Sequence, residues 1–255
     1  MDFYISGNTD VGRVKTVNQD GLLSLILQTR HGKMAFSVIC DGMGGLEYGE
    51  LASAAVVQAF RGWIVNELHE LCKAPLEDGA IRRAWQNIVS EMNESIQQQA
   101  REKGTRMGTT VVAMLLTQDR YYIMNVGDSR AYELTDGIRQ ISRDHSVVAR
   151  DIEAGLITPE EAEHHPRRNV LTQCIGASED VYAEMYFGPV QKNAVYMLCS
   201  DGFRHELTVE EIYNGLRPAD LVDQQMMNKR AQALIELNKQ RGEDDNISVT
   251  LIRTF

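Results

Sequence analysis

The chain has 255 residues, of which 43% are hydrophobic, and its formal net charge is −10. This length and apolar content are enough to bury a core within one domain, which we expect to span residues 1–255. The acidic balance argues against a nucleic-acid-binding surface. No run reaches the ~20 apolar residues that a membrane span needs, so we expect a soluble chain without a membrane partner.

The four cysteines point to a reducing compartment. They show no CxxC spacing, and no signal-peptide pattern follows Met1. We interpret them as reduced, mostly buried thiols, and we expect the chain to be cytoplasmic. The cysteines are Cys40, Cys72, Cys174 and Cys199.

Along the first 141 residues, the apolar pattern predicts strands, then two helices, then more strands. The first helix is predicted from Glu50 to Leu71 and is broken by Pro75. The second has an apolar stripe from Ile81 to Ile96 and ends at Gly104. The predicted strands are Phe3–Ser6, Gly21–Gln28, Met34–Cys40, Thr109–Leu116, Tyr121–Val126, Arg130–Leu134 and Ile138–Ile141.

The last third of the chain continues with both kinds of element. This order favours an α+β fold with antiparallel sheets over alternating βαβ units. The predicted elements are strands Val181–Tyr186, Ala194–Cys199 and Ile247–Arg253, and helices Glu210–Gly215 and Leu221–Asn238.

Residues 146–174 do not fit a compact sheet structure, because the segment is polar and broken. Thr158 and Glu161 have the spacing of a capping box, which predicts a short helix. We interpret the segment as a surface loop with two small helices. A loop of this length is often a lid or a binding element.

An aspartate lies at one end of each of five strand-like runs. Taken alone, Asp41 and Gly42 are most simply explained as an ordinary Asp-Gly turn at the end of a strand. If scattered, the five would be solvated turn carboxylates. If they converge, they would repel one another unless cations neutralise them, and oxygen-only ligands favour Mg²⁺ or Mn²⁺ over zinc. The five are Asp20, Asp41, Asp128, Asp201 and Asp245.

Eight short motifs follow one another in a specific order over almost the whole chain. In this order the sequence resembles the bacterial metal-dependent serine/threonine protein phosphatases of the protein phosphatase 2C family. The motifs lie at Thr9–Asp20, Asp41–Gly45, Met107–Thr110, Val126–Arg130, Asp144–Ser146, His165–Thr172, Ser200–Phe203 and Asp245–Val249.

The resemblance implies a four-layer α-β-β-α sandwich, with two antiparallel sheets packed face to face, helices outside and a mobile flap at about 146–174. It also implies an enzyme that hydrolyses phosphoserine and phosphothreonine by direct attack of a hydroxide that bridges two metal ions. The expected partners are phosphorylated proteins, including a serine/threonine kinase and its substrates, in bacterial signalling. A monomer is expected.

The resemblance also assigns the roles of the family's site residues to the matching positions of this sequence. The resemblance implies that Asp41 bridges two Mn²⁺ or Mg²⁺ ions, that the Gly42 carbonyl is a ligand, and that Asp201 and Asp245 complete the first site. Asp41, Asp201 and Asp245 are thus the expected catalytic residues. Asp20 supports the second ion through water. Asp128 either helps to hold a third, weaker ion or hydrogen-bonds a turn.

The sequence departs from the family pattern where a phosphate-binding Arg is expected, because Lys15 stands there. Lysine offers a point charge without the planar fork of arginine. Arg13 lies on the same side of an expected extended strand, so we expect Arg13 or Lys15 to contact phosphate. Met43 and Gln19 replace a frequent His and Glu. In the flap, Arg167 and Arg168 are candidates for phosphoprotein contact.

Two other functional classes compete with this hypothesis. A catalytically weak relative would bind phosphoproteins as an adaptor, and Lys15 is the feature that favours it. A small-phosphoester hydrolase would prefer nucleotide or sugar phosphates to phosphopeptides.

Overall fold

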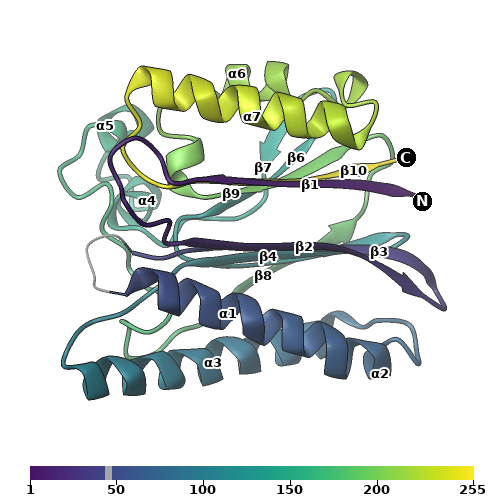
Figure 1. The fold of residues 1–255 in the computed structure, drawn as a ribbon, viewed down its shortest axis with the longest axis horizontal. Coiled ribbons are helices and arrows are strands. Elements are labelled where there is room, and N and C mark those ends of the chain that lie inside the picture. The colour runs from purple at the N-terminus through teal and green to yellow at the C-terminus, as the bar shows by residue number, and fades with distance from the viewer. Residues whose placement is uncertain (44–47) are drawn as a thin grey trace.

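Two five-stranded antiparallel sheets form the centre of the molecule (Figure 1). The computed structural model describes residues 1–43 and 48–255, so Gly44 and Gly45 of the Asp-Gly-Met-Gly-Gly motif lie outside the described residues. One sheet has the order β1-β10-β9-β6-β7 and the other β2-β3-β4-β5-β8. The strands are β1 Phe3–Asp10, β2 Asp20–Thr29, β3 Gly32–Asp41, β4 Val111–Leu116, β5 Arg120–Val126, β6 Arg130–Leu134, β7 Ile138–Gln140, β8 Glu184–Pro189, β9 Val195–Cys199 and β10 Ile247–Thr254.

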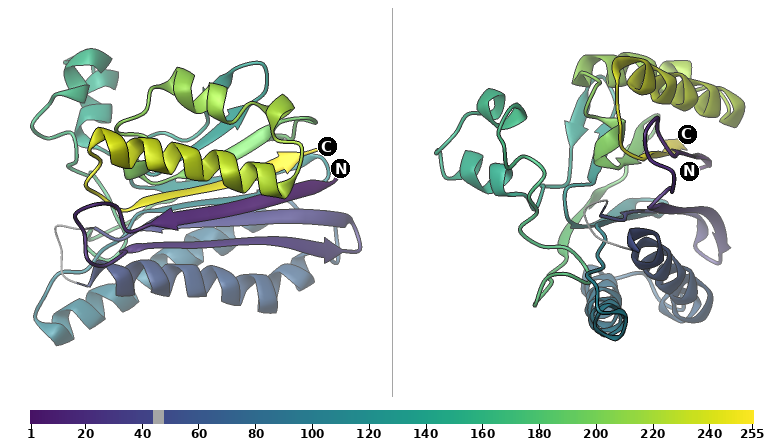
Figure 2. Two further views of the ribbon diagram at one scale, coloured as in Figure 1. Left: turned by 45° about the horizontal axis from the view of Figure 1, so that its top comes forward. Right: turned by 60° about the vertical axis from the view of Figure 1, so that its left-hand side comes forward.

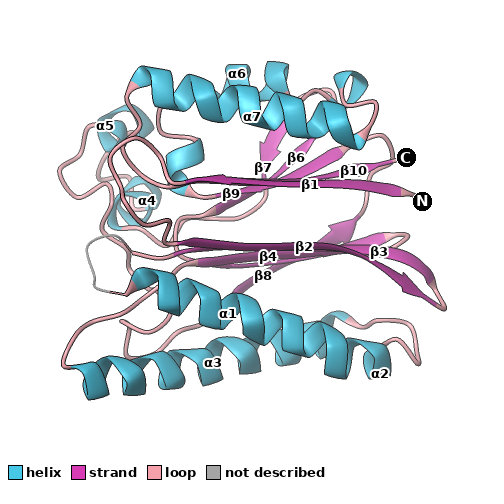
Figure 3. Ribbon diagram, viewed as in Figure 1, coloured by secondary structure: helices cyan, strands magenta, loops and turns pink. Residues whose placement is uncertain are grey.

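Helices cover the outer face of each sheet, so the predicted four-layer α-β-β-α order is confirmed (Figure 3). Helices α1 and α3 lie against the β2–β8 sheet, and α6 and α7 lie against the β1–β7 sheet. The helices are α1 Gly49–Trp63, α2 His69–Leu71, α3 Asp78–Lys103, α4 Val147–Glu153, α5 Pro159–Glu163, α6 Val209–Gly215 and α7 Gln224–Arg241. A π-helical turn, η1 Ile64–Leu68, joins α1 to α2, and short 3-10 turns are η2 Asp201–Phe203 and η3 Pro218–Asp220.

Three apolar layers hold the sandwich together, one between the sheets and one under each helical pair. In the layer under α1 and α3, Trp63 and Trp85 pack edge to face with ring centroids 5.7 Å apart. The apolar stripe of the second predicted helix is therefore core, because Ile81 and Trp85 are fully buried. Helix α3 ends at Gly104, which adopts a left-handed conformation with φ 66° as a C-cap. All four cysteines are buried and free.

Strand β8 is the element whose predicted position is wrong. The sequence predicts Val181–Tyr186, whereas the strand runs over Glu184–Pro189. The side chain of Gln86 binds the backbone of Val181 and Ala183, so these residues pair with α3 instead of with β5. An alternating pattern shows which residues face a core, but it does not show where pairing with a neighbour begins.

The flap segment projects from one side of the sandwich (Figure 2). It contains the two predicted short helices, α4 and α5, and the predicted capping box of Thr158 and Glu161 is present. Its two ends are tied together at the base, where the Thr172 N–H donates to the carbonyl of His145 over 2.8 Å. In the described part of the chain, no helix is long and apolar enough to cross a membrane.

Candidate metal centre

Five carboxylates from both sheets gather at one end of the sandwich. Asp20 begins β2 and Asp41 ends β3, and the two lie directly opposite each other in the antiparallel register. Asp201 follows β9, Asp245 precedes β10, and Asp128 lies in the turn between β5 and β6. Because the strands carry them to the same edge, carboxylates up to 225 residues apart in the numbering from Asp20 to Asp245 become neighbours.

The mutual repulsion of these groups shows in their pKa values. Burial raises the pKa of Asp41 well above its usual range, and the charges of the other four carboxylates raise it further. Burial also raises the pKa of Asp20 to about 7, although hydrogen bonds from Ser248 and Ser200 oppose the shift. The cluster therefore holds more negative charge than the protein alone neutralises.

The donor set fits divalent cations that prefer oxygen. Oδ1 of Asp20 is buried and has no hydrogen-bond partner among the described residues, whereas Oδ2 accepts a bond from Ser200 Oγ over 3.1 Å. A cation, directly or through water, would satisfy this oxygen. Within residues 1–43 and 48–255, however, no three His, Cys, Asp or Glu side chains are placed to hold an ion by themselves, so water would have to supply further ligands. Such an open arrangement suits Mg²⁺ or Mn²⁺, which keep several waters as ligands.

The backbone at Gly42 is packed too tightly for any side chain. A Cβ there would lie 2.5 Å from the carbonyl oxygens of both Gln19 and Gly49. The Gly42 N–H donates to the Gln19 carbonyl over 3.1 Å, which joins the ends of β2 and β3. Glycine is therefore required for close backbone packing beside Asp41.

Thr110 fixes the backbone of Asp41 from the next strand. The Asp41 N–H donates to Thr110 Oγ1 over 3.1 Å, and the Thr110 N–H donates to the Asp41 carbonyl over 2.9 Å. Thr110 Oγ1 in turn lies 2.8 Å from the hydroxyl of Ser129. This network holds the carboxylate at the end of β3 in one position.

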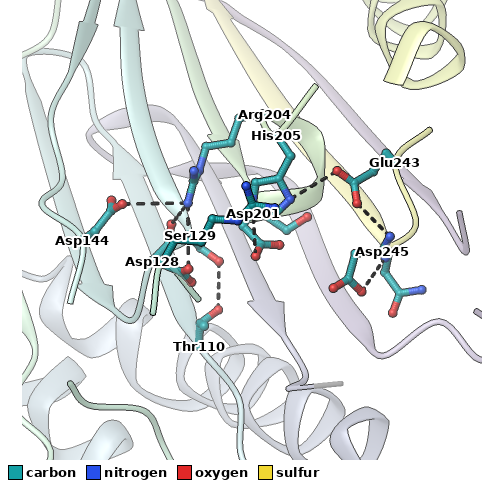
Figure 4. Close-up of polar contacts among 12 residues, drawn as sticks. Thr110, Asp128, Ser129, Asp144, Asp201, Arg204, His205, Glu243 and Asp245 are labelled. Carbon is teal, nitrogen blue, oxygen red and sulfur yellow. Dashed lines mark hydrogen bonds and ion pairs between the residues drawn. The ribbon is translucent and has the colours of Figure 1, made fainter. Parts of the chain in front are cut away.

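A histidine and a glutamate that sequence reasoning missed connect Asp201 to Asp245 (Figure 4). His205 Nε2 lies 3.5 Å from Asp201 Oδ2, and its Nδ1 lies 3.2 Å from Glu243 Oε2. Glu243 Oε1 accepts the backbone N–H of Asp245 over 2.8 Å. Burial would lower the pKa of His205, but its bond with Glu243 and the charge of Asp201 raise it overall. The sequence contained a local signal for this contact, because His205 lies about one helical turn after Asp201.

A second missed network surrounds Asp128. Arg204 Nη2 donates to the Asp128 carbonyl over 3.1 Å and lies 3.9 Å from Asp128 Oδ2. The same atom lies 3.8 Å from Asp144 Oδ2, and Arg130 binds Asp144 from the other side. Burial and then the charge of Asp201 raise the pKa of Asp128 to about 7, and Arg204 opposes this shift.

Of the two expected phosphate contacts, the structure brings one to the carboxylates. Lys15 Nζ lies 3.4 Å from Asp245 Oδ1. Arg13 donates instead to the Lys239 carbonyl near the end of α7, over 3.3 Å. The expectation that both lie on one extended strand is wrong, because residues 11–19 form a loop. In a loop, side chains two residues apart do not share a face.

The flap arginines lie in the flap itself and contact neither Asp41 nor Asp201. Arg167 Nη2 lies 3.4 Å from Asp151 Oδ2, and Arg168 Nη1 donates to the Glu163 carbonyl over 2.9 Å. Both arginines are exposed.

Other residues of the motifs have structural contacts. His145 is buried at the base of the flap, where Nδ1 accepts the Gly127 N–H and Nε2 lies 3.0 Å from Glu184 Oε2. The side-chain amide of Gln19 donates to Glu50 over 3.2 Å.

The structure thus defines a class of protein: an α-β-β-α sandwich with a cluster of carboxylates at one end of its two sheets. A sequence model described as protein phosphatase 2C matches residues 11–245. The chain belongs to the protein phosphatase 2C family, and the resemblance drawn from its motifs is confirmed.

Individual relatives agree over almost their full length. The serine/threonine phosphatase Stp of Listeria innocua is 31% identical over 250 residues, which are 96% of this chain and 93% of that protein. The protein phosphatase PhpP of Streptococcus pneumoniae is 28% identical, with 97% and 96% covered.

Two solved structures share the fold. The serine/threonine phosphatase Stp1 of Staphylococcus aureus superposes with a TM-score of 0.84 at 29% identity, covering 100% of this chain and 96% of that one. The catalytic domain of the phosphatase PstP, in complex with two manganese ions, gives a TM-score of 0.79 at 26% identity, with 98% and 97% covered.

Proposed function

We propose that this chain is a serine/threonine protein phosphatase that removes phosphate from phosphorylated proteins with the help of two Mn²⁺ or Mg²⁺ ions. The observation that carries the proposal is the convergence of carboxylates from both sheets around the unsatisfied Asp20 Oδ1. The named activity of the relatives and the two manganese ions of PstP support it.

Five residues would hold the ions, and the list follows the positions implied by the family: Asp20, Asp41, the carbonyl of Gly42, Asp201 and Asp245. When bound, such ions would lower the pKa of a water molecule and neutralise charge on the phosphoryl oxygens. Asp41 interacts with the whole set, because burial and then the charges of the other carboxylates raise its pKa.

The other side chains position substrate or ligands. Lys15 lies within reach of the cluster, so its ammonium would meet a phosphate dianion once Asp245 is engaged by a cation. No protein nucleophile is needed. Cys40 and Cys199 adjoin the site in sequence but are buried in the apolar layers under the helices.

Several finer statements belong to the same proposal. Residues 1–255 act as one phosphatase domain, since both sheets contribute carboxylates to one cluster. Arg167 and Arg168 contact phosphoproteins from the flap, where both are exposed. The four free thiols agree with action in the cytoplasm. The partners include a serine/threonine kinase and its substrates, and the enzyme is a monomer.

The test is hydrolysis of a phosphothreonine peptide and of p-nitrophenyl phosphate, with Mn²⁺, with Mg²⁺ and with EDTA. Asp41→Asn is the inactive variant, and Asp244→Asn is its matched control, because Asp244 is an exposed neighbour of Asp245. We expect turnover that EDTA and Asp41→Asn abolish and Asp244→Asn preserves. Metal binding without turnover would favour an adaptor, and a preference for nucleotide or sugar phosphates would favour a small-phosphoester hydrolase.

A further inference from the structure

Arg204 places a fixed positive charge beside Asp128. It directly follows the η2 turn that begins with Asp201, so its backbone is tied to a proposed metal ligand. Its side chain is 15% exposed, and that of Asp128 is 11% exposed. The two charges therefore interact where water screens them weakly.

The neighbouring carboxylate already has its own partner. Arg130 binds Asp144 in a bidentate manner, with Nε 2.8 Å from Oδ1 and Nη2 2.8 Å from Oδ2. Arg130 is thus the hydrogen-bonded partner of Asp144, whereas Arg204 lies 3.9 Å from Asp128 and 3.8 Å from Asp144 without such a bond to either carboxylate. Since Arg130 is committed to Asp144, the charge of Arg204 is available to Asp128.

A metal ion at Asp128 would have to compete with the positive charge of Arg204. Arg204 is held by its bond to the Asp128 carbonyl, and the distances of 3.9 and 3.8 Å to the two carboxylates describe charge pairing rather than hydrogen bonds. A divalent cation beside Asp128 would meet the guanidinium at close range, and like charges so close repel.

We infer that the Arg204 guanidinium supplies the positive charge that a third metal ion would otherwise bring to Asp128, so that this chain binds two ions and not three. The inference rests on the proposed function, because it presupposes the two-ion cluster. Of the two roles expected for Asp128, it disfavours the third ion and leaves the structural role in the turn.

The test counts bound ions without measuring turnover. Metal-stripped full-length protein is titrated with MnCl₂, and free Mn²⁺ is followed by its electron paramagnetic resonance signal. Two variants change Arg204: Arg204→Met keeps length but removes charge, and Arg204→Lys keeps charge. Asp128→Asn is tested alone and in a double variant with Arg204→Met. Arg143→Met is the matched control, because Arg143 is 54% exposed and pairs with Glu153 in the flap.

We expect two ions in the wild type, in Arg204→Lys and in Arg143→Met. We expect Arg204→Met to bind a third ion, at Mn²⁺ concentrations where the wild type binds two, and the double variant to lose it. The inference is overturned if Arg204→Met still binds two ions, or if the wild type binds a third that Asp128→Asn removes. The comparison of wild type with Asp128→Asn decides the matter even if Arg204→Met does not fold. A wild type that binds no Mn²⁺ would overturn the proposed function and this inference together.

Discussion

Lys15 Nζ lies 3.4 Å from Oδ1 of Asp245, so a proposed phosphate contact and a proposed metal ligand form an ion pair. The two side chains are 32% and 43% exposed, and pairs of this kind contribute about 0–1 kcal/mol to stability. Breaking this ion pair therefore costs little free energy. A cation bound by Asp245 would compete with this ion pair, and Lys15 would then be free to contact phosphate.

Replacement of Lys15 by arginine should improve catalysis. A guanidinium binds phosphate through two parallel hydrogen bonds, whereas an ammonium acts as a point charge. We expect Lys15→Arg to raise kcat/KM for a phosphothreonine peptide by roughly two- to tenfold, mainly through KM, with stability unchanged. Lys33→Arg, an exposed lysine paired with Asp2, is the control. An unchanged or lower kcat/KM for Lys15→Arg would mean that Lys15 does not contact phosphate.

Glu243 should position two metal ligands at once. It accepts the backbone N–H of Asp245 and pairs with His205, which lies beside Asp201. Loss of such an outer partner typically costs 10–100-fold in metal affinity, so we expect Glu243→Gln to weaken Mn²⁺ binding by about tenfold or more. Calorimetric titration measures this. Glu236→Gln, on the surface of α7, should bind as the wild type does. Equal affinities for both variants would show that Glu243 supports only the fold.

The metal-free protein should lose stability as pH rises. Asp20 has a folded pKa of about 7 against an ordinary value of 3.8, so the folded state binds more protons than the unfolded state between these values. The free energy of unfolding then falls as pH rises from about 4 to about 7, the opposite of an ion-paired carboxylate.

Thermal unfolding in EDTA checks this effect. We expect Asp20→Asn to unfold at nearly the wild-type temperature at pH 4.5 and several degrees higher at pH 7.5, at about 2–4 °C for each kcal/mol. Mn²⁺ at pH 7.5 should reverse the order of the two proteins. A temperature difference that does not change with pH would contradict the raised pKa.

Gly42→Ala should damage both stability and the site. Its Cβ would lie 2.5 Å from two backbone carbonyl oxygens, so the ends of β2 and β3 must separate. We expect a loss of roughly 2–4 kcal/mol in the free energy of unfolding and loss of metal binding. Gly62→Ala in α1 is the control, because nothing lies within 4 Å of a Cβ there and alanine favours a helix. Equal stability of the two variants would exclude the proposed crowding.

Local patterns in the sequence predicted much of the fold and the carboxylates of the site. Asp41 and Asp201 were found because each closes an apolar strand ahead of a glycine, and the helix at Pro159–Glu163 because Thr158 and Glu161 form a capping box. Runs of apolar residues likewise predicted most of the strands. These features depend on residues within a few positions of one another, so they are visible without a structure.

The tertiary structure alone decided which charges become partners. Arg204 donates to the carbonyl of Asp128, which lies 76 residues earlier in the chain. No local pattern around Arg204 predicts this contact. Arg13, expected beside Lys15, turns to α7 instead, because the loop that carries it does not alternate as a strand does. The energy of a charge depends on its distance to other charges and on burial. Both are set by the packing of distant segments, whereas periodicity and turn chemistry are properties of the local chain.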